Sequence, residues 1–298
     1  MKTSGRRSSS SGRAAPGNSL GRAGLVLFVL MALLPILFSL GYAAAYSTGT
    51  IGLLSDGFTW EHWAAVGRRG ELWSSFGLSL YIAFVTVVLT VSLALVLALY
   101  LRRPLGYGAL SYIIYFPLAL PATVAAFLVF QLFSGAGYAS RILIRLGLID
   151  GIDQFPGLVH DAFGIGIILA HLGLAVPFFI LLFVEIYNTE KVAALAQVAQ
   201  TLGARRRDVL YRVTVPILLT RCFTNIILLF IAVLGSYEIP LLLGRQAPQM
   251  VSVLTMRKYA MFDIAQKPEA FIVALLYTVL VLVLILVAFR KGRTAYGA

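Results

Sequence analysis

The chain has 298 residues, of which 60% are hydrophobic and 12% charged, and its mean hydropathy is +0.91. Soluble domains carry roughly 25% charged residues, so this chain has too few charges to cover a water-facing surface of its size. Its composition therefore predicts a membrane protein that is divided into spans rather than soluble domains. The single cysteine, Cys222, excludes an intrachain disulfide, a CxxC redox pair and a cysteine-based metal site.

Residues 1–22 are rich in Ser, Gly and Arg, and we expect them to form a disordered basic tail. Six apolar segments follow, each near the roughly 20 residues that cross a hydrocarbon core. Lipid offers no partner to an open sheet edge, so each segment should be a helix. The sequence predicts an all-α membrane protein over residues 23–298, with spans near 24–46, 76–101, 109–133, 163–187, 218–243 and 270–289.

The first span admits a second interpretation. A basic tail, an apolar stretch and the small residues Ala43, Ala44 and Ala45 are also typical of a cleavable signal peptide. The apolar run is longer than the roughly 7–15 residues of a signal-peptide core, and five more spans follow. We therefore interpret it as an uncleaved membrane anchor.

Basic residues indicate the orientation of the spans. If the N-terminus is cytoplasmic, the inner segments hold 16 of the 24 Lys and Arg residues, while most of the acidic residues fall in outer loops. Cytoplasmic loops of membrane proteins are enriched in Lys and Arg. We therefore expect both termini in the cytoplasm. Topology accounts for most of the +12 net charge, which argues against a nucleic-acid-binding role.

The longest predicted inner loop, 188–220, has the composition of a folded element. Thr189 is an expected N-cap for a helix that continues through Leu202. Gly203 fits a helix stop, because glycine adopts the left-handed conformation without strain. A second helix, 205–213, should end near Pro216. The first helix has one predicted apolar face, made of Val192, Leu195, Ala196, Ala199 and Leu202.

This pair of helices has two possible roles. An amphipathic hairpin could lie in the membrane interface, where its arginines would neutralise lipid phosphates. Alternatively, it could project into the cytoplasm as the docking element for a soluble partner. Composition and periodicity alone leave both roles open.

The run 197–204, followed by 213–216, resembles the EAA loop of ABC importer permeases. Gly203 falls on the glycine of that pattern, Ala199 on its second alanine and Pro216 on its proline. Gln197 and Val198 depart from it, because the family usually has glutamate and alanine at these places. Gln197 keeps the length and the hydrogen-bonding ability of glutamate but not its charge, which puts an ion pair from this position in doubt.

Three further segments extend the resemblance over about residues 75–290. The run 78–80 is similar to the N-S-L entry of the family's second span, and 116–121 to its P-L-x-x-P segment. The run 235–244 resembles the end of the fifth span in polyamine-type permeases and their relatives for iron and organophosphonates. This last similarity makes a small polar, polyamine-like solute a candidate substrate.

The resemblance implies a permease subunit in the bacterial inner membrane, with no cofactor and no catalytic residue of its own. The chain has no G-x-x-x-x-G-K-[ST] sequence, so ATP hydrolysis would belong to a separate ATPase. The resemblance also implies a second permease, expected to be a homologue, and an extracytoplasmic binding protein. The expected residues of the ATPase contact are Gln197, Ala199, Leu202, Gly203, Ala204, Arg205 and Pro216.

The binding protein should dock on the outer loops 47–75, 134–162 and 244–269. Candidate contacts are Asp56, Trp60, Trp63, Asp150 and Asp153.

Polar residues within the spans are candidates for the translocation path, because intramembrane polar groups are costly unless they are paired or functional. We expect the path to involve Glu238, Tyr237, Asn225 and His171. Glu238 and His171 could equally be structural partners between helices. Glu185, near the inner end of the fourth span, is interpreted as an interfacial structural residue. Pro117, Pro121 and Pro177 are expected to kink their helices.

Two other classes of function compete. A secondary transporter or channel would need no ATPase, but inverted repeats and dense midplane charges are absent from the sequence. An intramembrane enzyme is disfavoured because Ser134 has no G-x-S-x-G around it and no H-E-x-x-H motif occurs.

Overall fold

A computed structural model describes residues 17–52, 57–101 and 114–296. All regular elements in this part are helices, which confirms the all-α class. Six stretches are long and apolar enough to span a membrane, as predicted. They are Gly21–Ser47, Gly70–Tyr100, Ala122–Arg145, Ile165–Thr189, Arg206–Leu234 and Lys267–Val287. Most of the basic tail lies outside the described residues.

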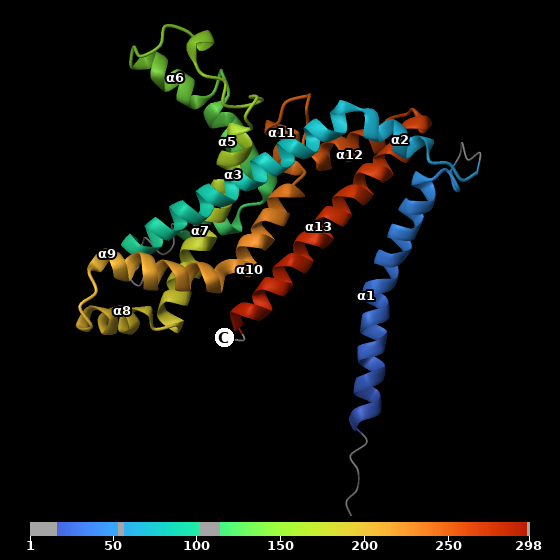
Figure 1. Ribbon diagram of the computed structural model, residues 1–298. Helices are drawn as coiled ribbons and strands as arrows, with labels where there is room; N and C mark the ends of the chain where they lie inside the picture. The colour runs from blue at the N-terminus through green and yellow to red at the C-terminus, as the bar shows by residue number, and fades with distance from the viewer. Residues whose placement is uncertain (1–16, 53–56, 102–113, 297–298) are drawn as a thin grey trace, which may run out of the picture.

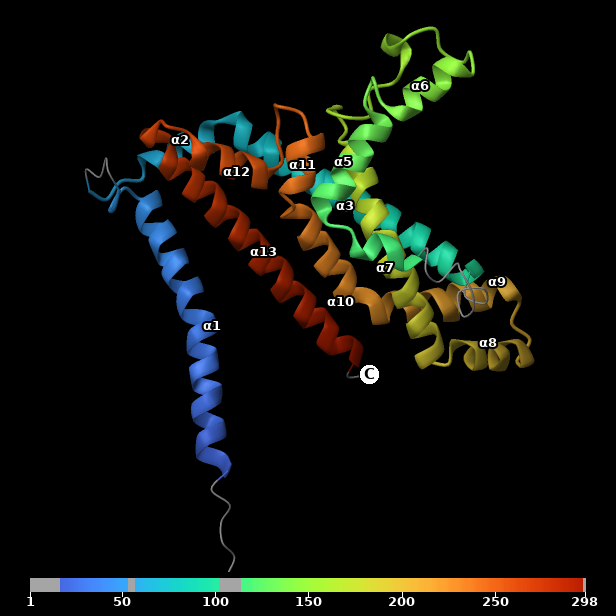
Figure 2. The same ribbon diagram turned by 180° about the vertical axis from the view of Figure 1, so that it is seen from behind.

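The helices have two distinct ends (Figures 1 and 2). One carries the short helices α8 (Val192–Thr201) and α9 (Arg206–Val209), together with the N-terminal end of α1 (Gly17–Ser47) and the C-terminal end of α13 (Lys267–Tyr296). We call it the inner end, after the predicted topology. The outer end carries α2 (Glu61–Arg68), α6 (Tyr138–Arg145), α11 (Glu238–Leu243) and α12 (Val251–Ala260). Both chain ends therefore lie on the side of the 188–220 loop.

The core is built by α3 (Gly70–Leu101), α7 (Ile165–Thr189) and α10 (Val215–Leu234), with α5 (Ala122–Phe133) against α7. Small residues occupy the contacts and let the backbones approach closely, among them Ala83, Ala94 and Ala126, which are fully buried. Large side chains such as Phe179 and Leu234 fill the remaining space. Close packing substitutes here for the hydrophobic driving force that lipid removes.

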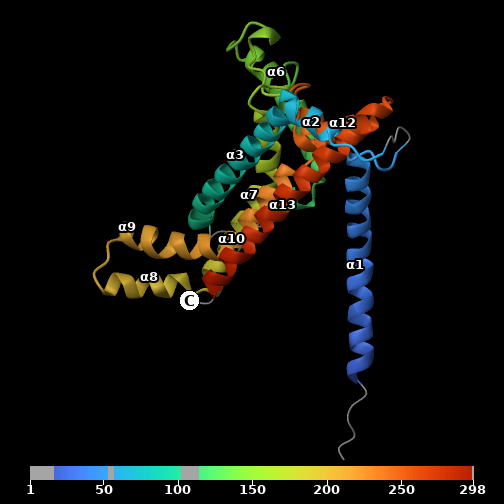
Figure 3. The ribbon, with the colours of Figure 1, turned by 45° about the vertical axis from the view of Figure 1, so that its right-hand side comes forward.

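Helix α1 stands apart from the other spans (Figure 3) and contacts mainly α13. The contact is aromatic and lies at the outer end, where the ring centroids of Tyr46 and Phe271 are 4.7 Å apart and those of Tyr42 and Phe271 are 5.9 Å apart. The Trp63 Nε1–H group donates to Ser47 Oγ over 3.3 Å. The apolar side chains from Leu25 to Phe38 are exposed, so this half of α1 packs on no other part of the described chain.

The third and fifth spans differ from their predicted form. The predicted helix 109–133 begins outside the described residues and is then interrupted, because the 3₁₀ turn Phe116–Ala119 ends at an extended Leu120. A residue that precedes proline avoids the helical region, so α5 begins only after Pro121. The predicted helix 218–243 is likewise two helices, α10 and α11, separated at residues 235–237.

The prediction that Pro216 ends a separate cytoplasmic helix is wrong. α9, a π-helical turn at Leu210–Thr214 and α10 form one continuous helix that passes the proline. Proline lacks an N–H group, and its ring clashes with the carbonyl four residues earlier. A π turn widens the helix at this point and accommodates the ring. Consequently, the second predicted helix of the 188–220 loop and the fifth span form one continuous helix, which bends along its length (Figure 1).

The outer end of α7 gives a direct test of the fold. Both carboxylate oxygens of Asp161 accept backbone hydrogen bonds at 2.8 Å, from the N–H groups of Phe163 and Ile165. Replacing Asp161 with alanine should lower the free energy of unfolding by about 1 kcal/mol, the usual effect of losing a helix cap. Asp161→Asn, which keeps one acceptor oxygen, should lower the free energy of unfolding much less. Thermal unfolding of both variants in detergent checks this capping role of Asp161. Equal melting temperatures for Asp161→Ala and the native chain would contradict it.

Candidate functional site

The corner between α7 and α8 positions the inner hairpin, which we define as α8, α9 and the turn between them. α7 continues through Thr189, so the prediction that Thr189 caps the next helix is wrong. Its hydroxyl donates instead to Glu185 Oε1 over 3.1 Å. Lys191, with φ of 49°, reverses the chain before α8. The Arg221 side chain pairs with Glu190 at 2.9 Å and ties this corner to α10.

The tip of the inner hairpin is a Schellman turn centred on Gly203. The Gly203 N–H donates to the Gln200 carbonyl over 2.9 Å, and the Ala204 N–H donates to the Ala199 carbonyl over 3.0 Å. Gly203 has φ of 88°, a conformation that an L side chain rarely adopts. The predicted glycine stop is therefore present. Because the space around Gly203 is open, its requirement for glycine is one of backbone conformation.

The predicted single apolar face of α8 is divided between two environments. Val192 is fully buried and Ala196 and Ala199 are half-buried, since α8 packs against α9 and the π turn. Leu195 and Leu202 face outward instead, with Val198 beside them, and Leu202 is 83% exposed. The result is a row of unpartnered apolar side chains that ends at the tip of the hairpin.

The residues predicted for the ATPase contact separate into two groups. Six of them surround the tip: Gln197, Leu202, Gly203 and Arg205 are exposed, while Ala199 and Ala204 are half-buried. Pro216 is exposed on α10, beyond the π turn, and does not belong to the tip.

A cavity of about 620 Å³ lies between α7, α10, α11 and the 3₁₀ turn at Phe116–Ala119. Most of its lining is apolar, and His171, Asn225 and Ser236 supply the polar groups. The His171 Nδ1 donates to the Ile167 carbonyl over 2.9 Å, which leaves Nε2 of the neutral ring as an acceptor. The Ser236 hydroxyl is buried and has no hydrogen-bond partner in the described part of the chain. His171 and Asn225 thus line the same cavity, and their role in a translocation path stays a prediction.

Glu238 and Tyr237 lie outside the lining of this cavity. Glu238 is exposed at the first position of α11, and no ion pair of the described residues includes it. Tyr237 lines a second cavity of about 350 Å³ with Ser252 and Tyr259. The break at residues 235–237 thus separates the predicted path residues. His171 and Asn225 line the first cavity, whereas Tyr237 and Glu238 lie outside it. Hydropathy could not show this, because 218–243 forms one mostly apolar segment in the sequence.

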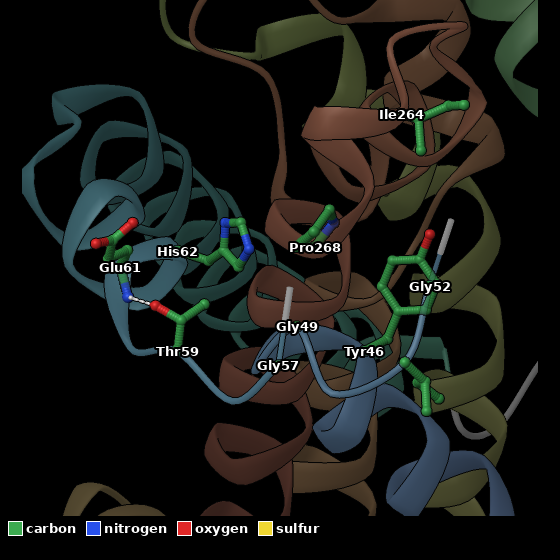
Figure 4. A pocket seen from close by; sticks show the side chains of 10 residues that line it. Tyr46, Gly49, Gly52, Gly57, Thr59, Glu61, His62, Ile264 and Pro268 are labelled. Carbon is green, nitrogen blue, oxygen red and sulfur yellow. Dashed lines mark hydrogen bonds between the residues drawn. The ribbon is translucent and has the colours of Figure 1, made fainter. Parts of the chain in front are cut away.

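The outer end has a third cavity, of about 410 Å³, where α1, α2 and the start of α13 meet. Figure 4 shows His62 and Pro268 on one side and Tyr46 on the other, with Gly49 and Gly57 below them. A Cβ on Gly49 would lie 3.1 Å from the Gly57 carbonyl oxygen, so glycine allows the two arms of this loop to meet.

The predicted contacts for a binding protein differ in exposure. Trp60 is 60% exposed, whereas Trp63 is half-buried and bonded to Ser47. Asp150 and Gln154 hydrogen-bond to each other in the loop after α6, and Asp153 is exposed. Asp56 lies outside the described residues.

Over the described residues, no group of three His, Cys, Asp or Glu side chains could hold a metal ion.

Comparisons with known proteins agree with this architecture. Residues 90–291 match the model of a family described as "Binding-protein-dependent transport system inner membrane component". Comparison with curated proteins gave no match.

Two crystal structures share the fold, each with a TM-score of 0.67 at 18% sequence identity. The first is of a bacterial ABC transporter involved in the import of the acidic polysaccharide alginate, where the alignment covers 92% of this chain and 95% of that one. The second is of a bacterial alginate ABC transporter in complex with a periplasmic protein that holds an alginate pentasaccharide, where the coverage is 92% and 93%.

The conformation of Gly203 predicts how its replacement will act. Gly203→Val forces a β-branched residue into the left-handed region, which costs about 1–2 kcal/mol and should loosen the tip. Gly203→Asn should cost less, because asparagine tolerates this region. Limited trypsin digestion reports the difference, since Arg205, Arg206 and Arg207 follow the turn directly. We expect the fastest cleavage there in Gly203→Val. Equal rates in all three proteins would contradict the backbone requirement.

Proposed function

Because the chain belongs to the family of binding-protein-dependent transport system inner membrane components, we propose that it is a permease subunit which forms half of a translocation path and is driven by a separate ATPase. The single observation that carries the proposal beyond the family is the exposed tip of the inner hairpin. Its apolar row, ending at Leu202, has no partner within the described chain. It sits at the end of a helix that continues into the wall of the cavity lined by His171 and Asn225.

The proposed ATPase contact is a helix-in-groove contact. Leu195, Val198 and Leu202 recur along one side of α8 and would enter an apolar groove of the ATPase. Arg205, exposed beside the tip, would meet carboxylates at the groove's edge. Gln197 is exposed and neutral, so this position would contribute a hydrogen bond rather than an ion pair. These assignments also make Gly203 the residue that sets the angle of the tip.

A second permease, by our proposal a homologue, would complete the path. The cavity rim carries exposed apolar side chains, among them Phe178 and Leu228, that a partner helix would cover. His171, Asn225 and Ser236 would then face the solute between the two subunits. Glu238 and Tyr237 would lie at the outer entrance.

The remaining assignments follow from the proposed topology. Both termini and the loop 188–220 would be cytoplasmic in a bacterial inner membrane, with 1–22 as the basic tail and 23–298 as the permease domain. An extracytoplasmic binding protein would dock at the outer end, where Trp60, Asp150 and Asp153 are available. Lipid would cover the exposed apolar half of α1.

The solute would be small and polar. The similarity of 235–244 to polyamine-type permeases keeps a polyamine-like solute as a prediction. No Asp, Glu, Lys or Arg lines the cavity that holds His171 and Asn225, so the ammonium groups of such a solute would rely on Glu238 or on the second permease for compensation.

Co-purification tests the ATPase contact. In gentle detergent, the native chain should bring down a P-loop ATPase in stoichiometric amount. Leu202→Asp should abolish this, because it places a charge on the apolar row without disturbing packing inside the chain. Gly203→Asp should act in the same direction by straining the tip. The matched control is Leu148→Asp, on the outer loop, where the leucine is also well exposed at 67%.

Two results would overturn the proposal. One is a native chain that purifies alone or as a simple homo-oligomer, which would favour a secondary transporter or channel. The other is unchanged ATPase recovery with Leu202→Asp.

Thiol labelling tests the path. Asn225 and Cys222 lie one turn apart on α10, but Asn225 lines the cavity whereas Cys222 is fully buried. A cysteine at Asn225, in a Cys222→Ala background, should react readily with a small water-soluble methanethiosulfonate, and native Cys222 should not. If an ATPase gates the path, a non-hydrolysable ATP analogue added to the complex of the chain with its ATPase should change the labelling rate of the cysteine at position 225. Equal reactivity at positions 222 and 225 would contradict a water-accessible cavity.

A further inference from the structure

Five charged side chains meet at the outer end, although they are far apart in the sequence. We define the outer charged cluster as Arg69, between α2 and α3, Glu71 in the first turn of α3, Arg257 and Lys258 in the last turn of α12, and Glu269 in the first turn of α13. Glu269 Oε2 lies 2.7 Å from Arg69 Nη1 and 2.9 Å from Lys258 Nζ. Glu71 pairs with Arg257 and, at 3.3 Å, with Lys258. Lys258 is therefore shared by both carboxylates.

Burial makes this cluster unusual for charged groups. Lys258 and Glu269 are each only 6% exposed. A buried charge is costly unless it is paired, and the removal of one partner leaves the other uncompensated. Each carboxylate here contacts two cations, and the cluster as a whole carries one excess positive charge. The three helices that supply it are consequently held in one arrangement.

Helix α12 connects this cluster to the transmembrane cavity. Its first N–H group, that of Val251, donates to Ser79 Oγ of α3 over 2.8 Å in a buried position. The Ser252 hydroxyl donates to the Ser236 carbonyl in the break between α10 and α11. Ser236 lines the cavity. A helix of ten residues, about 15 Å long, therefore has the charged cluster at one end and the cavity edge at the other.

The far end of α11 is also held by a contact from another part of the chain. The His160 N–H donates to the Leu243 carbonyl over 2.9 Å, and the His160 ring lies 3.1 Å from the Leu242 carbonyl oxygen. α11 is thus fixed at its C-terminal end by the loop before α7. The contact between Ser252 and Ser236 is then the place where a shift of α12 reaches the cavity.

We propose that the outer charged cluster holds α12 across the outer end of the cavity, and that Lys258 and Glu269 are positioning residues which set how far the cavity opens on this side. The proposal uses the proposed function only to name the cavity as a translocation path. The arrangement itself is a property of this chain, and it is measurable without an ATPase or a solute.

The test measures the reactivity of a cysteine at the cavity edge. The reporter is Ser236→Cys in a Cys222→Ala background, purified as the full chain in nanodiscs and treated with a charged methanethiosulfonate. Glu269→Gln, which keeps the size of the side chain but removes its charge, should raise the labelling rate at position 236 about tenfold, the scale expected when a hydrogen bond to a charged group is lost. Lys258→Met should act in the same direction.

Two controls separate positioning from general stability. Glu190→Gln breaks the ion pair with Arg221 at the inner end, also 2.9 Å long, and should leave labelling at position 236 unchanged. Native Cys222, which is fully buried, reports on loosening of the whole fold when it is measured in a separate Glu269→Gln chain that keeps Cys222 and Ser236, and it should stay unlabelled there. Should Glu269→Gln fail to accumulate, Glu71→Gln carries the same test, because Glu71 is half-exposed and pairs with both Arg257 and Lys258 of α12.

Each outcome decides the proposal. Faster labelling at position 236 with an unreactive Cys222 supports it, whether or not an ATPase co-purifies. Unchanged labelling at position 236, or an equal increase at Cys222, overturns it and reduces the cluster to a stabilising contact. Loss of ATPase binding in Leu202→Asp has no bearing on this result, so the two proposals fail independently.

Discussion

The need to satisfy every backbone hydrogen bond inside a membrane controls this structure. Lipid provides no partner for a free N–H or carbonyl group, so a helix can be interrupted only where protein or a water-accessible cavity replaces the lost bonds. The interruptions of the predicted spans 109–133 and 218–243, near Pro121 and at residues 235–237, both border the cavity between α7, α10 and α11. The Ser252 hydroxyl donates to the Ser236 carbonyl in the second break, and the His160 N–H donates to the Leu243 carbonyl at the far end of α11. The position of the cavity therefore follows from where the helices are allowed to break.

The continuity of α9 with α10 links the inner hairpin to that cavity. Had Pro216 ended a separate helix, a flexible joint would lie between the tip at Gly203 and the polar group of Asn225. The π turn at Leu210–Thr214 instead lets one continuous helix extend from Arg206 to Leu234. A displacement of the hairpin by a bound partner would move the cavity wall with it as a rigid body.

Sequence reasoning found the features that depend on local composition. Hydropathy located the spans, and the glycine at position 203 predicted a left-handed turn, because both signals are contained in a short window. Sequence reasoning failed where the local structure depends on residues that are distant in the sequence or on how the helices pack. Thr189 has a good capping side chain, yet the helix continues past it, and Pro216 is accommodated by a π turn. The outer charged cluster could not be predicted, because Arg69 and Glu71 meet Arg257, Lys258 and Glu269 only after the helices have packed. Sequence periodicity could not divide Asn225 from Glu238 either.

The two ends of the molecule are consequently held by different forces and should differ in mobility. At the outer end, aromatic contacts of Tyr42 and Tyr46 with Phe271 join α1 to α13, and the charged cluster joins α13 to α3 and α12. At the inner end, α1 stands free of the other spans, and among the described residues the main contacts of α8 are with α7, α9 and the π turn. Regions with few tertiary contacts open at lower free energy than densely bonded ones. An outer frame that resists displacement and an inner hairpin that is free to move would convert motion of the hairpin into a change in the cavity between them.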